Sequence, residues 1–322
     1  MNRFIEPTTD FGFKKLFGEE KSKSILKSFL FHILKLESPI AEITFMKQEQ
    51  LPDSSVERVG VYDIFCIDEK GSRFIVEMQR GSQIFYKDRL LYYSTFPIYQ
   101  QAKKGEWNYQ LNPVYCVGVL GFRLEEDDRY FRRVKLCDID THEVFYDKLT
   151  FVFVELPKFN KELNELKDHA DRWFYFLKHL SELNEVPEEL SDEEEMKDAF
   201  RIAEISAMTV EERDRYETSL KHLRDAYSVI ETARIKGLTE GRAEGITEGR
   251  AEGRADGLIE GEIRTLLSFT ELRFGKTSEF IEKKLHEIRN EDILLDIKKL
   301  ILNTSSLQEL EQAIIERVRV GT

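Results

Sequence analysis

Apolar and polar residues alternate between residues 61 and 81, where the sequence reads VYDIFCIDEKGSRFIVEMQRG. Side chains on a strand point to opposite faces with a period of two, so this pattern predicts two strands joined by a tight turn. The residues expected to share one core face are Tyr62, Ile64, Cys66, Phe74, Val76 and Met78. The opposite face is also largely apolar, and we therefore expect a hairpin within residues 59–79 that is buried on both sides.

Each of the two predicted strands carries a carboxylate inside its apolar run, Asp63 in the first and Glu77 in the second. If the turn places Gly71 in the left-handed conformation, Asp68 pairs with Ser72. Counting back along both strands then places Asp63 opposite Glu77, about 5 Å away. Two like charges at that distance in a half-buried sheet require a shared proton, a basic side chain or a metal ion, and a divalent cation fits best.

The remaining pattern of the first half predicts alternating helices and strands. Helical spacing covers residues 23–37 and the aromatic stretch 82–105, in which Pro97 is expected to kink or divide the helix. Strand-like runs rich in β-branched and aromatic residues cover residues 41–50, 114–122, 130–139 and 149–156. This order predicts a mixed α/β domain of residues 1–158.

The second half of the chain has helical patterns and no strand signal. We expect a helical region over residues 159–233, a glycine-repeat helix or linker over 234–264, and a C-terminal helical segment over 265–322. Glycine recurs every four residues, at positions 237, 241, 245, 249, 253, 257 and 261. Collagen needs a period of three, so it is excluded. Two interpretations stay open for residues 236–262: a helix through which the chain forms a homo-oligomer, or a flexible, solvated linker.

Composition and charge add three constraints. The chain has 322 residues, 41% of them hydrophobic, which is ample for a folded core. No apolar run reaches the roughly 18 to 20 residues of a membrane span and the opening MNRFIEPTTD lacks a signal-peptide pattern, so we expect a soluble, cytoplasmic protein without membrane contact. The formal charge is −13, but residues 1–158 hold 23 Lys and Arg against 24 Asp and Glu, so the acidity belongs to the second half and does not exclude a nucleic-acid partner for the first.

Cysteine and histidine spacing argues against several other classes. Cys66, Cys116 and Cys137 are too few and too scattered for a disulfide framework or a zinc site, and we expect buried thiols. The six histidines show no HExxH and no close pair in the sequence, which disfavours zinc hydrolases and HNH-type nucleases.

Three motifs together resemble a known group of enzymes. They are the opening DFGFKKLF from Asp10, the pair formed by Asp63 and the run Glu77-Met78-Gln79, and the later DRLLYYSTFPIYQQ. Over about residues 1–155 the chain resembles the PD-(D/E)XK nuclease superfamily, and within it the bacterial PD-(D/E)XK transposase group related to the recombination-promoting (Rpn) nucleases. The resemblance implies a restriction-endonuclease-like mixed sheet flanked by helices. It also implies a metal-dependent DNA endonuclease linked to mobile elements or DNA recombination, or else a catalytically weak or inactive nuclease-fold protein that binds DNA or serves in assembly.

The resemblance also assigns roles to residues. Asp63 and Glu77 bind Mg²⁺, with Mn²⁺ as a substitute, and the Met78 carbonyl is a further ligand. Gln79 stands where the superfamily usually has lysine, although the transposase-like group tends to carry glutamine there. Glutamine can orient the attacking water but supplies no positive charge.

Four further residues are candidates for supporting roles, each with a structural alternative. Asp10 either supports the site or forms the N-cap of a short helix. Arg89 and Tyr93 lie four apart on one helical face, where they either meet a phosphate or pack. Gln100 could approach the metal from the same helix, but the direction depends on Pro97.

Overall fold

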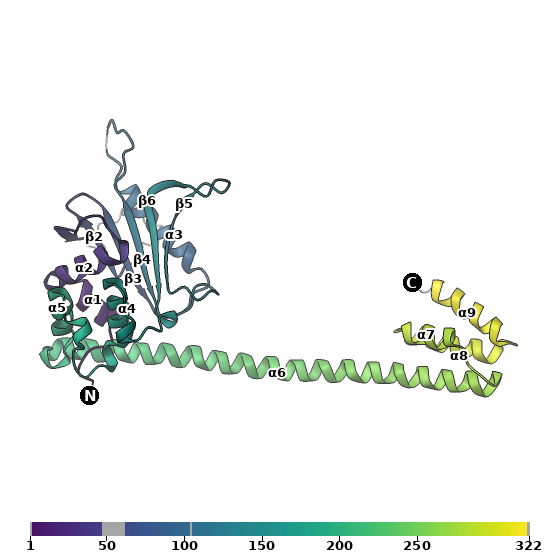
Figure 1. Ribbon diagram of the computed structural model, residues 1–322. Coiled ribbons are helices and arrows are strands. Elements are labelled where there is room, and N and C mark those ends of the chain that lie inside the picture. The colour runs from purple at the N-terminus through teal and green to yellow at the C-terminus, as the bar shows by residue number, and fades with distance from the viewer. Residues whose placement is uncertain (1, 47–61, 104, 321–322) are drawn as a thin grey trace. The chain divides into compact units, whose positions relative to one another are not determined.

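A computed structural model of the chain describes residues 2–46, 62–103 and 105–320 and contains two compact units, Met1–Ser228 and Val229–Thr322 (Figure 1). The predicted residues 47–50 of the first strand and 59–61 of the hairpin lie outside the described residues. Within the part of the chain that is described, no helix is long and apolar enough to cross a membrane.

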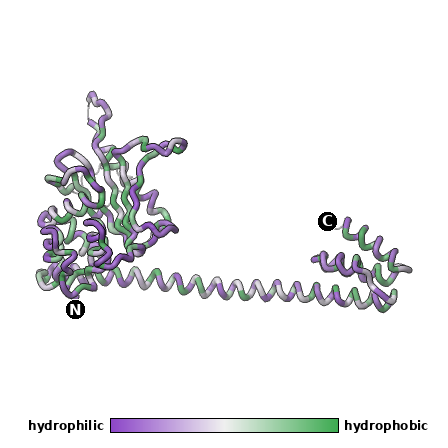
Figure 2. Tube along the Cα trace, in the orientation of Figure 1, coloured by the Kyte–Doolittle hydropathy of each residue, from purple (hydrophilic) through white to green (hydrophobic). Residues whose placement is uncertain are grey.

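The first unit is built on a six-stranded mixed sheet with the strand order β1-β2-β3-β4-β6-β5. The strands are β1 (Ile43–Phe45), β2 (Ile64–Asp68), β3 (Arg73–Gln79), β4 (Val114–Leu120), β5 (Phe131–Cys137) and β6 (Val144–Glu155). The central strands β3, β4 and β6 run parallel, while β1, β2 and β5 pair in antiparallel fashion. Figure 2 shows hydrophobic residues gathered along these strands, as expected for a sheet covered on both faces.

The hairpin has the predicted turn and register. Gly71 has a φ of 83°, and the Asp68 N–H donates to the Ser72 carbonyl over 3.0 Å. Ile64 then pairs with Val76, which fixes the alternation of faces along both strands. The predicted face is correct for every described member except Tyr62, which precedes β2 and lies with Phe65 on the opposite face.

Among the described residues of the first unit, a group of helices covers one face of the sheet and another helix covers the opposite face (Figure 1). The first group is α1 (Asp10–Phe17), α2 (Lys23–Leu34), α4 (His169–His179) and α5 (Glu194–Ala203), and the opposite helix is α3 (Tyr86–Tyr99). Phe29 of α2 meets the Trp173 ring of α4 at 5.8 Å in the core of the first face. This core therefore combines residues from both halves of the first unit. Pro97 lies inside α3 near its C-terminus, and the helix is not divided there.

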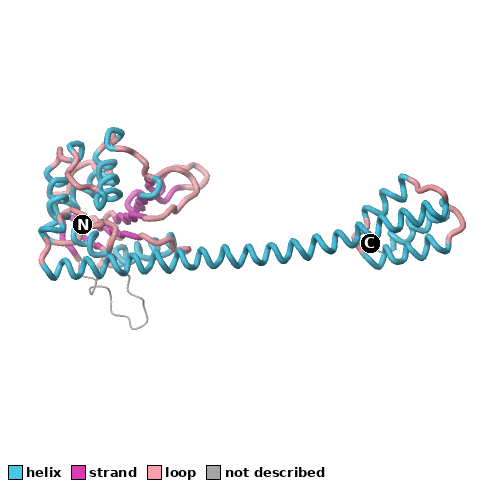
Figure 3. Tube along the Cα trace, turned by 90° about the horizontal axis from the view of Figure 1, so that it is seen from below, coloured by secondary structure: helices cyan, strands magenta, loops and turns pink. Residues whose placement is uncertain are grey.

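Helix α6 (Val210–Phe274) begins in the first unit, where the Tyr216 hydroxyl accepts a hydrogen bond from the Glu6 N–H over 2.8 Å. The described residues of the second unit, 229–320, form helices and loops (Figure 3). Its helices α7 (Glu279–Glu287), α8 (Glu291–Asn303) and α9 (Leu307–Val320) share one hydrophobic core with the C-terminal part of α6. The glycine repeat is helical within α6, and a Cβ added at any of its seven glycines would meet nothing within 4 Å.

The expectation of three buried thiols was wrong for Cys137. Cys66 and Cys116 are buried in the central strands, whereas Cys137 ends the edge strand β5 and is exposed. An edge strand leaves one side without a covering layer, so an apolar sequence context does not guarantee burial there.

Candidate active site

Asp63 and Glu77 face each other at the open end of the β2–β3 hairpin. The Asp63 N–H donates to Glu77 Oε1 over 3.3 Å, and the Met78 N–H donates to Asp63 Oδ2 over 2.7 Å. Each carboxylate is thus held by backbone of the opposing strand. The predicted juxtaposition of the two acids follows from the register set at Gly71.

The two acids lie in a poorly solvated environment. Glu77 is 5% exposed, and burial together with the neighbouring Asp63 raises its pKa to about 8. Burial also raises the pKa of Asp63, although the Met78 N–H and the charge of Lys14 act in the opposite direction. Among the described residues, no Lys or Arg forms an ion pair with either carboxylate within 4 Å. A buried acid pair without a bound counter-charge is suited to a divalent cation.

Gln79 lies two residues beyond Glu77 on the same face of β3, and its side-chain amide is held at both ends. Arg89 Nη2 donates to Gln79 Oε1 over 2.7 Å, and Gln79 Nε2 donates to the Gly81 carbonyl over 2.9 Å. The sequence predicted both residues as site candidates but did not predict that they bind each other. Through this contact the Arg89 guanidinium lies beside Gln79, and it carries the positive charge that the glutamine lacks.

The aromatic residues of α3 hold Arg89 in place. Its guanidinium lies 5.3 Å from the ring centre of Tyr86 and 5.7 Å from that of Tyr93, so both rings contribute cation–π contacts. Tyr93 also packs against Tyr62 at 5.3 Å. The predicted pairing of Arg89 and Tyr93 on one helical face is therefore present, and it serves packing as well as positioning.

The sequence did not single out Tyr86, which is part of the same group. Its side chain is 1% exposed, and its hydroxyl has no hydrogen-bond partner among the described residues. Gly118, which pairs with Glu77 across β3 and β4, makes room for this hydroxyl, since a Cβ there would lie 2.4 Å from it. The only sequence signal was a glycine in the middle of an apolar strand, which often marks a close approach.

Asp10 lines the same cavity as Asp63 and pairs with Lys14, whereas Gln100 lies away from the acid pair. Thr9, not Asp10, is the N-cap of α1, because its hydroxyl accepts a hydrogen bond from the Gly12 N–H. Asp10 is the first helical residue and forms an ion pair with Lys14 at 2.6 Å. Gln100 is the C-cap of α3, eleven residues and about 16 Å of helix rise beyond Arg89, so the structure does not bring it to the acids.

A cavity of about 550 Å³ opens beside Asp63. Asp10, Lys14, Asp63, Arg80 and Arg215 contribute to its lining, so α1, the hairpin and the N-terminal part of α6 all contribute to it. Lys14, Arg80 and Arg215 are cationic, and Asp10, Glu19, Asp63 and Asp214 bring carboxylates to the same lining. The cavity therefore borders one edge of the acid pair, on the side of Asp63.

The mixed sheet, its helical layers and the acid pair at the end of a hairpin define a restriction-endonuclease-like α/β fold. Residues 7–233 match the model of the PD-(D/E)XK nuclease family transposases, and the chain belongs to that family. No curated protein matches the chain. No solved structure matches it either.

PD-(D/E)XK nucleases generally use divalent metals, and the residues of this chain fit such a group. The acid pair offers hard oxygen donors of the kind that Mg²⁺ prefers. The Tyr86 hydroxyl is a buried polar atom of the same group, with no hydrogen-bond partner in the described part of the chain. Asp63 and Glu77 are the side chains of this group that would hold a divalent cation.

Proposed function

We propose that this protein is a metal-dependent endonuclease that hydrolyses phosphodiester bonds in DNA, of the transposase and recombination-promoting type. The observation that carries the proposal is the buried pair Asp63 and Glu77, which lacks an ion-pair partner among the described residues. Burial and the neighbouring Asp63 raise the pKa of Glu77 to about 8. A pair of this kind is costly for a folded chain unless a bound cation offsets it.

Asp63, Glu77 and the Met78 carbonyl are the residues that would hold the metal, and their oxygen donors favour Mg²⁺ or Mn²⁺. When bound, such an ion lowers the pKa of a water and stabilises charge that develops on the phosphodiester. Asp63 is fixed by the Met78 N–H, so its orientation does not depend on the ion.

Gln79 and Arg89 would act as one unit beside the acids. The Gln79 amide keeps one N–H and one lone pair beyond its bonds to Gly81 and Arg89, and these can orient the attacking water. The Arg89 guanidinium, fixed by Gln79 and two tyrosine rings, would meet the scissile phosphate and supply the positive charge that lysine usually provides.

The cavity beside Asp63 would receive the DNA backbone. Lys14, Arg80 and Arg215 line it, and cationic side chains on separate elements suit contacts to successive phosphates. Such contacts position the strand without reading its sequence. We therefore expect cleavage with little sequence preference.

The proposal is tested by incubating the purified protein with supercoiled plasmid, with and without Mg²⁺. We expect nicking only with the metal, and loss of at least about 100-fold in rate for Asp63→Asn and Glu77→Gln, because a catalytic metal supplies several kcal/mol of transition-state stabilisation. Glu69→Gln is the matched control, since Glu69 is an exposed acid in the turn of the same hairpin. Nicking that survives in Glu77→Gln would show that the activity comes from a contaminant.

The second candidate is a nuclease-fold protein that binds DNA without cutting it, which the double engagement of the Gln79 amide favours. If it holds, the protein shifts the mobility of plasmid DNA, the shift is lost when Arg89 or Lys14 is replaced, and no cleavage occurs in Mg²⁺ or Mn²⁺. Comparing Arg89→Lys with Arg89→Gln separates the two functions. For an endonuclease, Arg89→Gln lowers the cleavage rate of bound DNA about 10- to 100-fold, and Arg89→Lys restores part of it.

A further inference from the structure

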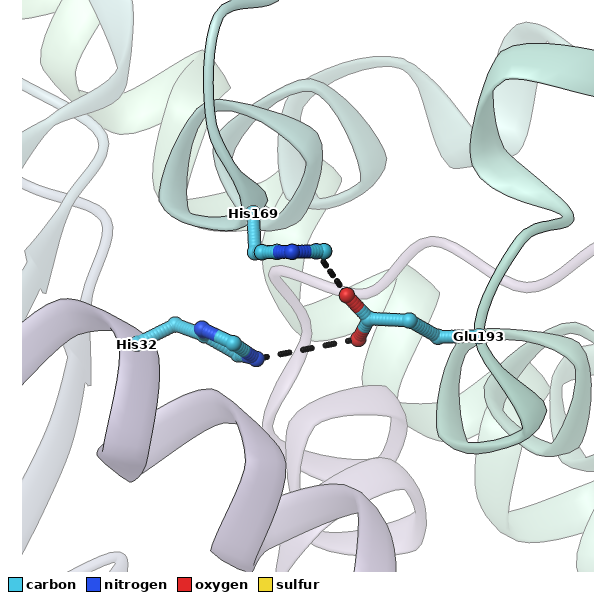
Figure 4. Close-up of side chains that lie close together, drawn as sticks. All are labelled: His32, His169 and Glu193. Atoms are coloured by element: carbon cyan, nitrogen blue, oxygen red, sulfur yellow. Dashed lines mark ion pairs between the residues drawn. The ribbon is translucent and has the colours of Figure 1, made fainter. Parts of the chain in front are cut away.

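A second cluster of metal-binding side chains lies on the face of the sheet opposite to α3. His32 of α2, His169 at the start of α4 and Glu193 at the N-cap of α5 converge there (Figure 4). One possible ligand atom from each side chain lies within 4.8 Å of those of the other two. The histidines are far apart in the sequence, so their spacing gave no sign of this group.

Helix packing explains why the three side chains meet. His32 lies three residues after Phe29 and His169 four residues before Trp173, so each shares a helix face with one member of the Phe29–Trp173 contact. Glu193 lies three residues before the buried Met196 on the core-facing side of α5. The cluster therefore lies at the edge of the same three-helix contact that forms the core.

Both histidines contact the same carboxylate. His32 Nε2 lies 3.7 Å from Glu193 Oε2, and His169 Nδ1 contacts Glu193 Oε1. The two imidazole rings stack at 4.5 Å, an arrangement that is unfavourable if both are protonated. Glu193 Oε1 is buried and accepts no well-aligned hydrogen bond from the described residues.

The surrounding charges are compatible with a cation. Glu195 lines the adjoining cavity of about 320 Å³ together with His32 and Glu193. Arg172 lies 3.5 Å from His169 Nδ1, but its guanidinium is directed to Asp192, which accepts a hydrogen bond over 3.0 Å.

We propose that His32, His169 and Glu193 form a Zn²⁺ site that ties α2, α4 and α5 together. Two imidazoles and one carboxylate are a donor set that zinc accepts, with water as the fourth ligand. Zinc ligands at 2.0 to 2.2 Å lie about 3.3 to 3.6 Å from each other in a tetrahedron, so the His32–Glu193 pair is already near that spacing and the tighter His169–Glu193 pair must open to reach it. The role we assign is structural, because the three ligands come from three packed helices and neither Asp63 nor Glu77 belongs to the group.

Zinc binding by the full-length protein tests the proposal. After treatment with EDTA and dialysis, the protein is incubated with ZnCl₂, freed of excess metal and assayed for zinc by mass spectrometry. We expect one zinc per chain for wild type and for Glu77→Gln, and loss of bound zinc in His32→Gln and His169→Gln. Retention in Glu77→Gln separates this site from the nuclease pair, so the outcome is independent of the proposed nuclease function.

His179→Gln is the matched control, because His179 lies on α4 and contacts Glu182 at 2.9 Å without a second histidine. It should bind as much zinc as wild type. A thermal scan covers the case in which a variant is unstable: zinc at about 100 times its Kd should raise the melting temperature of wild type by about 5 to 10 °C and leave that of His32→Gln unchanged. Equal zinc content in wild type and both histidine variants, or a wild-type melting temperature that zinc does not change, would overturn the proposal.

Discussion

Replacing Glu77 by glutamine should stabilise the metal-free protein at alkaline pH. Burial and the adjacent Asp63 raise the pKa of Glu77 from 4.5 to about 8, so the folded protein holds a proton that the unfolded chain releases above pH 4.5. The stabilisation is fully present below pH 4.5 and is lost as the pH rises through 8. The slope is about 1.4 kcal/mol for each pH unit, which gives a total loss of about 5 kcal/mol from this group.

Glutamine has nearly the same shape and no charge, so it removes this loss. We expect Glu77→Gln and wild type to have similar free energies of unfolding near pH 4.5. At pH 8 the variant should be more stable by a few kcal/mol in the presence of EDTA. Mg²⁺ should then stabilise wild type and leave the variant unaffected, because the ion offsets the charge of the ionised pair.

Urea unfolding followed by tryptophan fluorescence measures this difference. Trp107 and Trp173 both belong to the first unit, so the signal reports the unit that contains the site. Glu155→Gln is the control of opposite sign. Glu155 is also buried, which by itself raises its pKa, but Lys158, the Leu124 N–H and Arg132 outweigh that effect and lower the pKa.

The stabilisation from Glu155 is present above its unfolded pKa and is lost at acid pH, so Glu155→Gln should be less stable than wild type at pH 8. A difference between Glu77→Gln and wild type that does not change from pH 5 to pH 8 would refute the reasoning. That result would mean that Glu77 is ionised in the folded protein and that a cationic side chain such as Arg89 or Lys14 already compensates it.

Two further predictions concern glycines. Gly118→Ala should lower the free energy of unfolding by about 1 to 3 kcal/mol and displace Arg89, because the new Cβ would meet the Tyr86 hydroxyl. Urea unfolding measures the loss of stability, and plasmid nicking measures the displacement of Arg89. An unchanged nicking rate would show that Tyr86 does not contribute to the site. Alanine at Gly245, Gly249 and Gly253 should stabilise an isolated helix by about 1 kcal/mol each. If this segment joins two chains through close backbone contact, the alanine variant should form fewer oligomers, and light scattering should give a lower mass. Deletion of residues 236–262 should have the same effect. A monomeric mass for both the wild type and the deletion variant would exclude assembly through this segment.

The acid pair could be predicted from the sequence because it depends on local rules. Strand alternation and the positive φ of Gly71 act over a few residues, and together they fix the register that sets Asp63 against Glu77. Another local rule, the preference for certain residues at a helix N-cap, was wrong by one residue at the start of α1. Thr9 and Asp10 are both good N-caps, and the sequence pattern does not distinguish between them, whereas the Thr9 hydroxyl also donates to the Glu6 carbonyl in the folded chain.

Contacts between distant segments were decided by tertiary packing alone. The bond from Arg89 to Gln79 depends on how α3 lies on the sheet, and Tyr86 reaches the site because β4 carries Gly118 beside β3. His32 and His169 meet since large side chains at neighbouring positions, Phe29 and Trp173, fix how α2 packs on α4. Periodicity predicts which face of each element is buried. Which other element packs against that face depends on the complementary shapes of side chains that are remote in the sequence.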